Sequence, residues 1–322
     1  MSRHPLFSVG VRVNGRLRDV PTDLPTDAFF PIYSITKTLT AICVLRLVEH
    51  GVFGLDDPIT AHVTDVDLPK AITLTHLLRH TSGLRDYGPL KVYHDAVRAH
   101  AGVPWTRQQF LDSVVPAGLH FPPGETFSYS NPGYMLLIDA IERVSGLSFA
   151  KAIDRFVVKP LALRRTMTLE TIDDLLACEP GFGRGVTPDD RVVDVRGIYH
   201  PGWCAPRLVG STVEEVTLIF DVLLGGRLLA PDSLDRMLTL IDLDASSPPG
   251  TDIGGGMGLY SDRNNTNGRN FHHGGGGPGW DLSVTTFMDL PIGRTTVAIF
   301  ANSCDQPRAA SHHEAAILES LR

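Results

Sequence analysis

The chain has 322 residues, 43% of them hydrophobic and 20% charged, which suffices for a large core in one domain or two lobes. Its formal net charge of −7 and the lack of any basic run argue against nucleic-acid binding. No apolar stretch is long enough for a secretory leader or a membrane span, so we expect a cytoplasmic protein without a membrane partner. The four cysteines form no C-x-x-C pair, which favours reduced thiols.

The first predicted element is a β-hairpin. The segment FSVGVRVNGRLRDV alternates in hydrophobicity around Asn14-Gly15, a strong signal for a two-residue turn. An apolar helix over 35–49 follows, with Gly51 as the residue that ends it. From about 73 to 245 the patterns are mostly helical.

The periodicity changes near residue 250, where short glycine-punctuated segments predict antiparallel strands, and a last helix is expected over 307–321. Strands at both ends with helices between them predict an α+β fold. We expect an antiparallel sheet built from both termini and flanked by helices (1–72 and 250–322), with a mostly helical lobe (73–249) inserted into it.

The helix over 35–49 is apolar on nearly all faces and is therefore predicted to be buried. Ser34 would lie at its N-terminal end, where backbone N–H groups favour developing negative charge. Lys37 lies three residues on, so it shares a helical face with Ser34. Burial penalises a charged ammonium, and the pair is then a candidate nucleophile and base. The alternative is that Ser34 only caps the helix and Lys37 reaches solvent.

A second motif is Tyr129-Ser130-Asn131, followed by Pro132. Asn131 before a proline is typical of a helix N-cap, and Tyr129 would then lie just outside the helix. A phenol near a lysine loses its proton more easily, so Tyr129 is a candidate general base and acid. The amide of Asn131 is suited to bind a substrate carbonyl and the lysine together.

The third motif is the stretch HHGGGGPGW, whose glycines allow a ligand or another backbone to approach closely. No G-K-[ST] follows, which argues against a phosphate loop. On a strand His272 and His273 would point to opposite faces, so we expect no metal site and no cofactor.

In this order, the three motifs resemble the serine β-lactamase and penicillin-binding protein superfamily, whose signature includes S-x-x-K. The likeness is greater to its class C β-lactamase-like branch of esterases, D-aminopeptidases, DD-peptidases and transacylases. The segments that carry it are FFPIYSITKTLTAICVLRLVEHGVFGLDDPI, ITLTHLLRHTSGL, FPPGETFSYSNPGYMLLIDAIERVSG and HHGGGGPGW.

The resemblance implies that Ser34 is the acylated nucleophile, that Lys37 activates it and that Tyr129 is the general base and later acid. It places Asn131 at the substrate and aligns His273-Gly274-Gly275 with the K-T-G motif of many lactamases. Gly275 and Gly276 would then line the substrate edge, and the backbone N–H groups of Ser34 and Gly276 would form the oxyanion hole.

The chain departs from the branch in its helical lobe, where CAPRLVGST stands in place of a glycine-rich segment. There Tyr199, His200, Trp203 and Arg207 are candidates for a pocket wall. Arg207 is suited either to meet a substrate carboxylate or to form a surface ion pair.

We therefore expect a serine hydrolase that acts on a small-molecule ester or amide, because His273 replaces the lysine of many lactamases. One alternative is a β-lactamase or a D-amino-acid or DD-peptidase with a leader missing from this sequence. The other is a catalytically silent binding protein on the same fold. The sequence does not specify the natural substrate or the oligomeric state.

Overall fold

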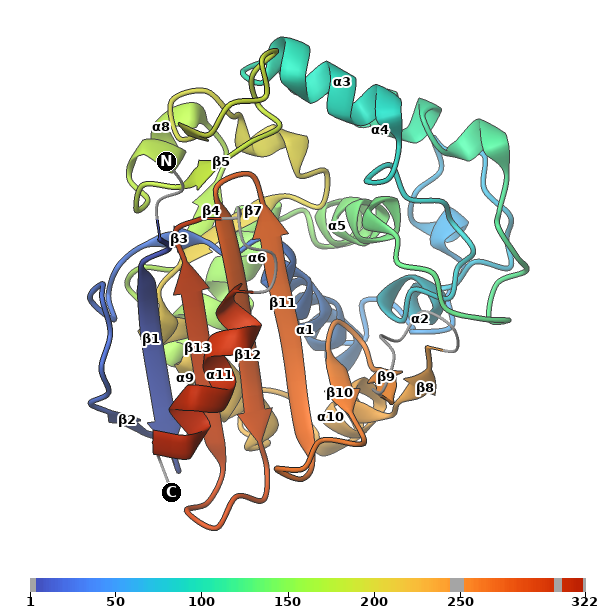
Figure 1. Cartoon of the computed structure of the whole chain (residues 1–322). Coiled ribbons are helices and arrows are strands. Elements are labelled where there is room, and N and C mark those ends of the chain that lie inside the picture. Colours follow the sequence, from blue (N-terminus) through green and yellow to red (C-terminus); the bar gives the residue numbers. More distant parts are fainter. Residues whose placement is uncertain (1–3, 244–251, 304–308, 321–322) are drawn as a thin grey trace.

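The computed structural model describes residues 4–243, 252–303 and 309–320. Its main sheet has eight strands in the order β2-β1-β13-β12-β11-β10-β9-β8 (Figure 1). The bounds of these strands are β1 (Phe7–Val13), β2 (Arg16–Arg18), β8 (Ile241–Asp242), β9 (Ile253–Gly255), β10 (Tyr260–Asp262), β11 (Asn270–Gly277), β12 (Trp280–Phe287) and β13 (Thr295–Ala301). The expected sheet from both ends of the chain is thus confirmed, because β1 pairs antiparallel with β13 from Phe7↔Ala301 to Val13↔Thr295.

The predicted hairpin is present between β1 and β2. Asn14 and Gly15 have φ angles of 48° and 84°, which match the left-handed conformations that a tight hairpin turn requires.

Helices cover both faces of the sheet. Helix α11 (Ala309–Ser320) lies on one face, and α9 (Val213–Leu224) packs on the other against β1 and β13 (Figure 1). Side chains alternate accordingly, since Val297 and Ile299 join the cluster under α11, whereas Ala298 and Phe300 join the larger core. Helix α9 therefore packs on the sheet although its sequence lies within the range predicted for the helical lobe.

The segment between the two parts of the sheet contains most of the described helices. Its described helices are α1 (Thr36–Glu49), α2 (Leu74–Leu78), α3 (Lys91–His100), α4 (Arg107–Asp112), α5 (Asn131–Ser145), α6 (Phe149–Ile153), α7 (Lys159–Leu161), α8 (Ile172–Leu176) and α10 (Pro231–Leu238). Short 3-10 turns are η1 (Tyr33–Ile35), η2 (Ile59–Ala61), η3 (Val115–Ala117) and η5 (Pro201–Trp203), and η4 (Asp154–Val158) is a π-helical turn. Helices α1 and α5 pack side by side, and α2 packs against α5.

Two small sheets within this segment were not predicted. One joins β3 (Phe30–Pro31), β7 (Leu208–Ser211) and β4 (Met167–Leu169), and the other pairs β5 (Phe182–Gly183) with β6 (Val193–Asp194). Their strands have two to four residues, too few for a period to be read. The predicted domain boundary near residue 250 and Cys304 lie outside the described residues. Cys43, Cys178 and Cys204 are free thiols.

Candidate active site

Ser34 lies in the 3-10 turn η1, which runs directly into α1. The expected helix over 35–49 is therefore confirmed to within one residue, and Ser34 lies two residues before its first residue, Thr36. Tyr33, the residue before it, has a φ of 42°, a conformation that non-glycine residues rarely adopt. Its hydroxyl donates to the carbonyl of Pro278 at 2.8 Å, which ties this turn to the end of β11.

Lys37 is only 3% exposed and lies one helical turn beyond Ser34. Its ammonium donates to Ser34 Oγ at 3.3 Å and to Asn131 Oδ1 at 2.8 Å. The pairing of Ser34 with Lys37 that was predicted from their spacing is therefore present, and the lysine does not reach solvent.

Tyr129 lies in the loop before α5, and its Oη is 2.9 Å from Ser34 Oγ. The ammonium of Lys37 lies 4.9 Å from the centre of the Tyr129 ring. The hydroxyl of Ser34 is thus within hydrogen-bond distance of both an amine and a phenol, although Tyr129 is 95 residues away in sequence.

The helix cap in this motif differs from the prediction. Ser130, in place of Asn131, is the N-cap of α5, because its backbone is extended and its Oγ accepts the N–H of Gly133 at 3.2 Å. Asn131 is the first residue of the helix, and its side chain is free of any capping role. The amide can therefore bond to Lys37.

Asp86 orients that amide, and sequence reasoning did not identify it. Its carboxylate accepts the backbone N–H of Asn131 at 3.1 Å and the Nδ2 group at 3.2 Å. With Nδ2 held by Asp86, the Oδ1 atom of Asn131 faces Lys37. Burial raises the pKa of Asp86, while the bonds from Asn131 oppose this shift. The only sequence signal was an acidic residue in the turn after HTSGL.

The imidazole of His80 packs against the ring of Tyr129. The two rings are stacked with centroids 4.4 Å apart, and His80 Nδ1 accepts the N–H of Ser130 at 3.1 Å. Burial lowers the pKa of His80 well below its usual value, and the nearby charge of Lys37 lowers it further. The segment ITLTHLLRHTSGL carries part of the family resemblance, but nothing in the sequence indicated that this imidazole stacks on the phenol.

The glycines of β11 allow it to pass close to the nucleophile turn. A Cβ atom on Gly275 would lie 2.5 Å from the carbonyl oxygen of Ile32, and one on Gly277 would lie 2.1 Å from the Tyr33 ring. Gly276 lines the same cavity as Ser34. The described register pairs β10 with β11 only at His272, so β10 does not cover the edge beside Gly276. The oxyanion hole from Ser34 and Gly276 stays a prediction.

His273 is buried beside this site but does not line the cavity. Its Nδ1 lies 2.6 Å from the carbonyl oxygen of Gly274, and its Nε2 has no hydrogen-bond partner among the described residues. Burial lowers the pKa of His273 to about 3, so the ring is neutral at neutral pH. His273 was predicted to lie at the substrate, but it is not one of the residues that line the cavity.

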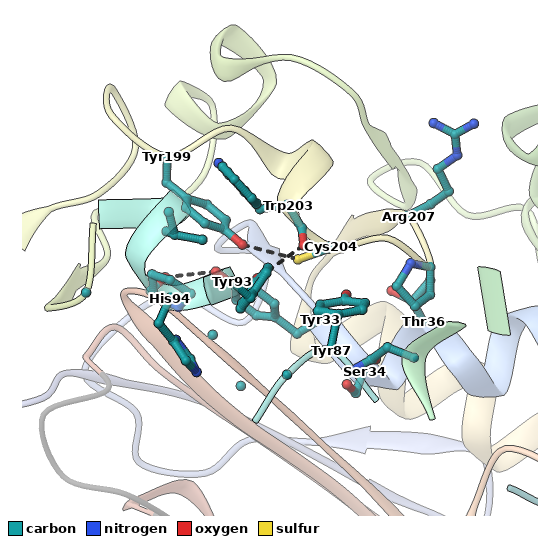
Figure 2. A pocket seen from close by; sticks show the side chains of 18 of the residues that line it. Tyr33, Ser34, Thr36, Tyr87, Tyr93, His94, Tyr199, Trp203, Cys204 and Arg207 are labelled. Carbon is teal, nitrogen blue, oxygen red and sulfur yellow. Dashed lines mark hydrogen bonds between the residues drawn. The ribbon is translucent and has the colours of Figure 1, made fainter. Parts of the chain in front are cut away.

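A cavity of about 360 Å³ opens at Ser34. Three of the four residues predicted for its wall line it, namely Tyr199, Trp203 and Arg207. Figure 2 shows the rings of Tyr87, Tyr93 and Tyr199 grouped together, whereas the guanidinium of Arg207 points away from them.

The prediction that His200 lines the cavity at Ser34 is wrong, because His200 lines a neighbouring cavity of about 420 Å³. Its Nδ1 accepts the N–H of Gly202 at 2.9 Å and so caps the turn η5.

The described residues provide neither a cluster of metal ligands nor a membrane-spanning helix. No group of three or more His, Cys, Asp or Glu side chains there is arranged to hold a metal ion. None of the helices described combines the length and the apolar character that crossing a bilayer requires.

This fold and the cluster of serine, lysine, tyrosine and asparagine are those of the class of β-lactamase-like and penicillin-binding proteins. The chain belongs to the Beta-lactamase family, whose model matches residues 4–322.

The relatives of the chain include proteins with different named activities. It is 26% identical to Penicillin-binding protein 4* of Bacillus subtilis (strain 168), over 92% of this chain and 65% of that protein. It is 32% identical to Esterase EstB of Burkholderia gladioli, over 46% of this chain and 40% of the esterase. The crystal structure of a D-stereospecific amidohydrolase from Streptomyces sp. matches with a TM-score of 0.79 and 27% identity, over 93% of this chain and 89% of that one. The chain thus spans less than two thirds of the length of either curated relative.

Proposed function

We propose that this protein is a serine hydrolase that forms an acyl-enzyme on Ser34 from a small-molecule ester or amide. The observation that carries the proposal is the position of Ser34 Oγ, 2.9 Å from Tyr129 Oη and 3.3 Å from Lys37 Nζ. A hydroxyl between a phenol and an amine is activated when one of them takes its proton. An esterase and an amidohydrolase among the similar proteins support this reaction class.

In the first half of the reaction the hydroxyl proton of Ser34 passes to the phenolate form of Tyr129, which the ammonium of Lys37 stabilises. Ser34 Oγ attacks the carbonyl carbon, and the negative oxygen is stabilised by the N–H groups of Ser34 and Gly276. The bond to the leaving group then breaks, and the leaving atom takes the proton from Tyr129. In the second half, water attacks the acyl carbon, its proton passes to Tyr129, and Ser34 regains a proton.

The test is covalent labelling. A fluorophosphonate probe is expected to add one adduct to the folded protein, on the peptide that contains Ser34, as read by mass spectrometry. Ser34→Ala is expected to lose both the adduct and the turnover of 4-nitrophenyl acetate, while its circular dichroism spectrum stays that of the wild type. A folded wild-type protein that takes up no adduct on Ser34 would instead support the silent binding protein.

A β-lactamase or D-amino-acid peptidase activity is the second candidate, favoured by the similarity to Penicillin-binding protein 4*. Turnover of nitrocefin and of 4-nitrophenyl acetate is compared on the same preparation. A clear preference for the lactam would replace the ester or amide as the proposed substrate class.

A further inference from the structure

The residues that line the cavity at Ser34 indicate which part of a substrate it would hold. It is lined by Ser34, Asn131 and Gly276, but not by Tyr129. In the proposed function, on which this inference rests, the leaving group takes its proton from Tyr129 and so departs on the side of that phenol. The other substituent of the carbonyl then points into the cavity.

The walls of the cavity are aromatic. Tyr33, Tyr87, Tyr199 and Trp203 are at most 5% exposed, and Tyr93 is half-buried. An apolar cavity of about 150 Å³ is enough to bind benzene. The cavity of about 360 Å³ therefore has room for a phenyl ring and the atoms that link it to the carbonyl.

The polar atoms of these aromatic side chains are already bonded within the protein. Tyr93 Oη donates to the carbonyl of Trp203 at 3.2 Å, and Tyr87 Oη accepts the N–H of Ala205 at 3.1 Å. Tyr199 Oη lies 3.7 Å from Cys204 Sγ (Figure 2). Trp203 Nε1 donates to the carbonyl of Ala101 at 2.9 Å. The hydroxyl of Tyr33 bonds to Pro278 as described above. A ligand therefore meets mainly ring carbon surface.

The charges of the cavity have one sign. Among the described residues that line it there is no aspartate or glutamate, whereas Lys37, Arg184 and Arg207 are basic. The carboxylate of Asp86 accepts hydrogen bonds from both the backbone N–H and the Nδ2 group of Asn131. A substrate ammonium in this cavity would have no carboxylate partner and would lie near Lys37, an arrangement that costs free energy.

We infer that this cavity is an acyl-group pocket that selects a neutral aromatic acyl group and rejects one that carries a free α-ammonium. The substrate class is then an arylalkanoyl or N-blocked aminoacyl ester or amide, in contrast to a free amino-acid amide. Burial of the ring provides the affinity, and the missing carboxylate provides the discrimination.

The first experiment compares four 4-nitrophenyl esters on the wild-type protein, namely the 3-phenylpropanoate, the propanoate and the esters of both enantiomers of phenylalanine. The pH is kept low enough to protonate the amine, and each kcat/KM is divided by the spontaneous hydrolysis rate of that ester. The phenylpropanoate is expected to exceed the propanoate by about ten- to a hundredfold, since burying an aromatic side chain contributes about 1.5–3 kcal/mol. The normalised kcat/KM of the phenylpropanoate is also expected to exceed that of the phenylalanine esters by about tenfold or more. The ammonium of the phenylalanine esters would lie near the like charge of Lys37 and would lack a hydrogen-bond partner, and each of these effects is unfavourable enough to lower kcat/KM by about that factor.

The second experiment places a carboxylate in the wall. His94 lines the cavity from α3 and is exposed, so His94→Asp is tolerated by the fold. His100→Asp is the matched control, since it makes the same change on an exposed residue of the same helix outside the cavity lining. Only His94→Asp is expected to raise the ratio of kcat/KM for the phenylalanine ester to that for the phenylpropanoate, by about threefold or more.

Equal normalised kcat/KM for the charged and neutral esters, a preference for the ammonium, or an equal effect of the two substitutions would overturn the inference. These results are distinct from a failure of the proposed function, which shows as a folded protein without an adduct on Ser34 and without turnover of any ester. Labelling of Ser34 with no ester preference would refute the acyl-group pocket alone.

Discussion

At the scale of single residues, Ser34, Lys37, Tyr129 and Asn131 form one connected set of hydrogen bonds. The network extends outward through Asp86, which bonds to Asn131 twice. Atoms that share bonds in this way have coupled energies, so the effects of substitutions are not expected to add.

Tyr129→Phe removes the phenol that is proposed to carry the proton. The expected result is a fall in kcat/KM for 4-nitrophenyl esters of about 10²–10⁴-fold, the range that general acid–base catalysis contributes. Tyr134→Phe is the control, because its hydroxyl donates to the carbonyl of Leu78 at 2.8 Å and not to Ser34. It should lose about 0.5–1.5 kcal/mol of unfolding free energy and keep its rate within about threefold. Full activity in Tyr129→Phe would refute the proton-transfer role.

Asp86→Asn keeps the shape of the side chain but replaces one acceptor with a donor that faces Asn131. One of the two bonds to Asn131 is then lost, and its amide no longer has a single favoured orientation. We expect kcat/KM to fall about five- to a hundredfold, as for other buried hydrogen bonds to charged groups. In an Asn131→Ala background the same substitution should have little further effect on the rate, which marks Asp86 as a positioning residue. Independent effects in the two backgrounds would contradict this role.

At the scale of elements, the site depends on how closely β11 approaches the turn η1. The contact is between backbones, since Gly275 faces the carbonyl of Ile32. Backbone atoms cannot rotate away as a side chain can, so added volume at this point moves the turn that carries Ser34.

Gly275→Ala is expected to lower both the unfolding free energy, by about 1–3 kcal/mol, and the rate of Ser34 labelling by a fluorophosphonate. Gly274→Ala is the control on the same strand, because its Cβ atom would meet only the carbonyl of Leu282 at 3.7 Å, an ordinary contact. Denaturant unfolding and labelling rates are measured for both variants. Equal behaviour of the two would show that the close approach of β11 does not position the site.

At the scale of the whole molecule, burial of ionisable groups couples stability to pH. His80 and His273 are at most 3% exposed, and burial holds the pKa of both below the usual value, that of His273 at about 3. Below about pH 6.5 the unfolded chain therefore binds protons that the folded protein does not bind. The resulting stability is complete above the unfolded pKa and is lost as the pH falls.

We expect the unfolding free energy to decrease from pH 7 to pH 5, with each such histidine adding a slope of about 1.4 kcal/mol per pH unit once its unfolded form is protonated. His273→Gln removes one of these groups, so its unfolding free energy should depend less steeply on pH than that of the wild type. Denaturant titrations at several pH values measure both slopes. Identical slopes would show that His273 does not bind its proton as weakly as its burial implies.

The sequence by itself determined what depends on short spacings. Hydrophobic period and turn residues predicted the hairpin at Asn14-Gly15, the helix that follows Ser34 and the strands at both ends of the chain. The spacing of Ser34 and Lys37 placed both on one helical face, because three residues make nearly one turn.

Only the tertiary structure decided which distant residues complete the site. Asp86 and His80 come from the turns after α2 and bond to Asn131 and Ser130 beside Tyr129. His273 is buried and does not line the cavity, and His200 lines a different one. Their side chains are placed by packing among helices and strands that are far apart in sequence, and no local period encodes that packing. The same reason applies to the charge of the acyl-group pocket, which is the sum of residues from many separate segments.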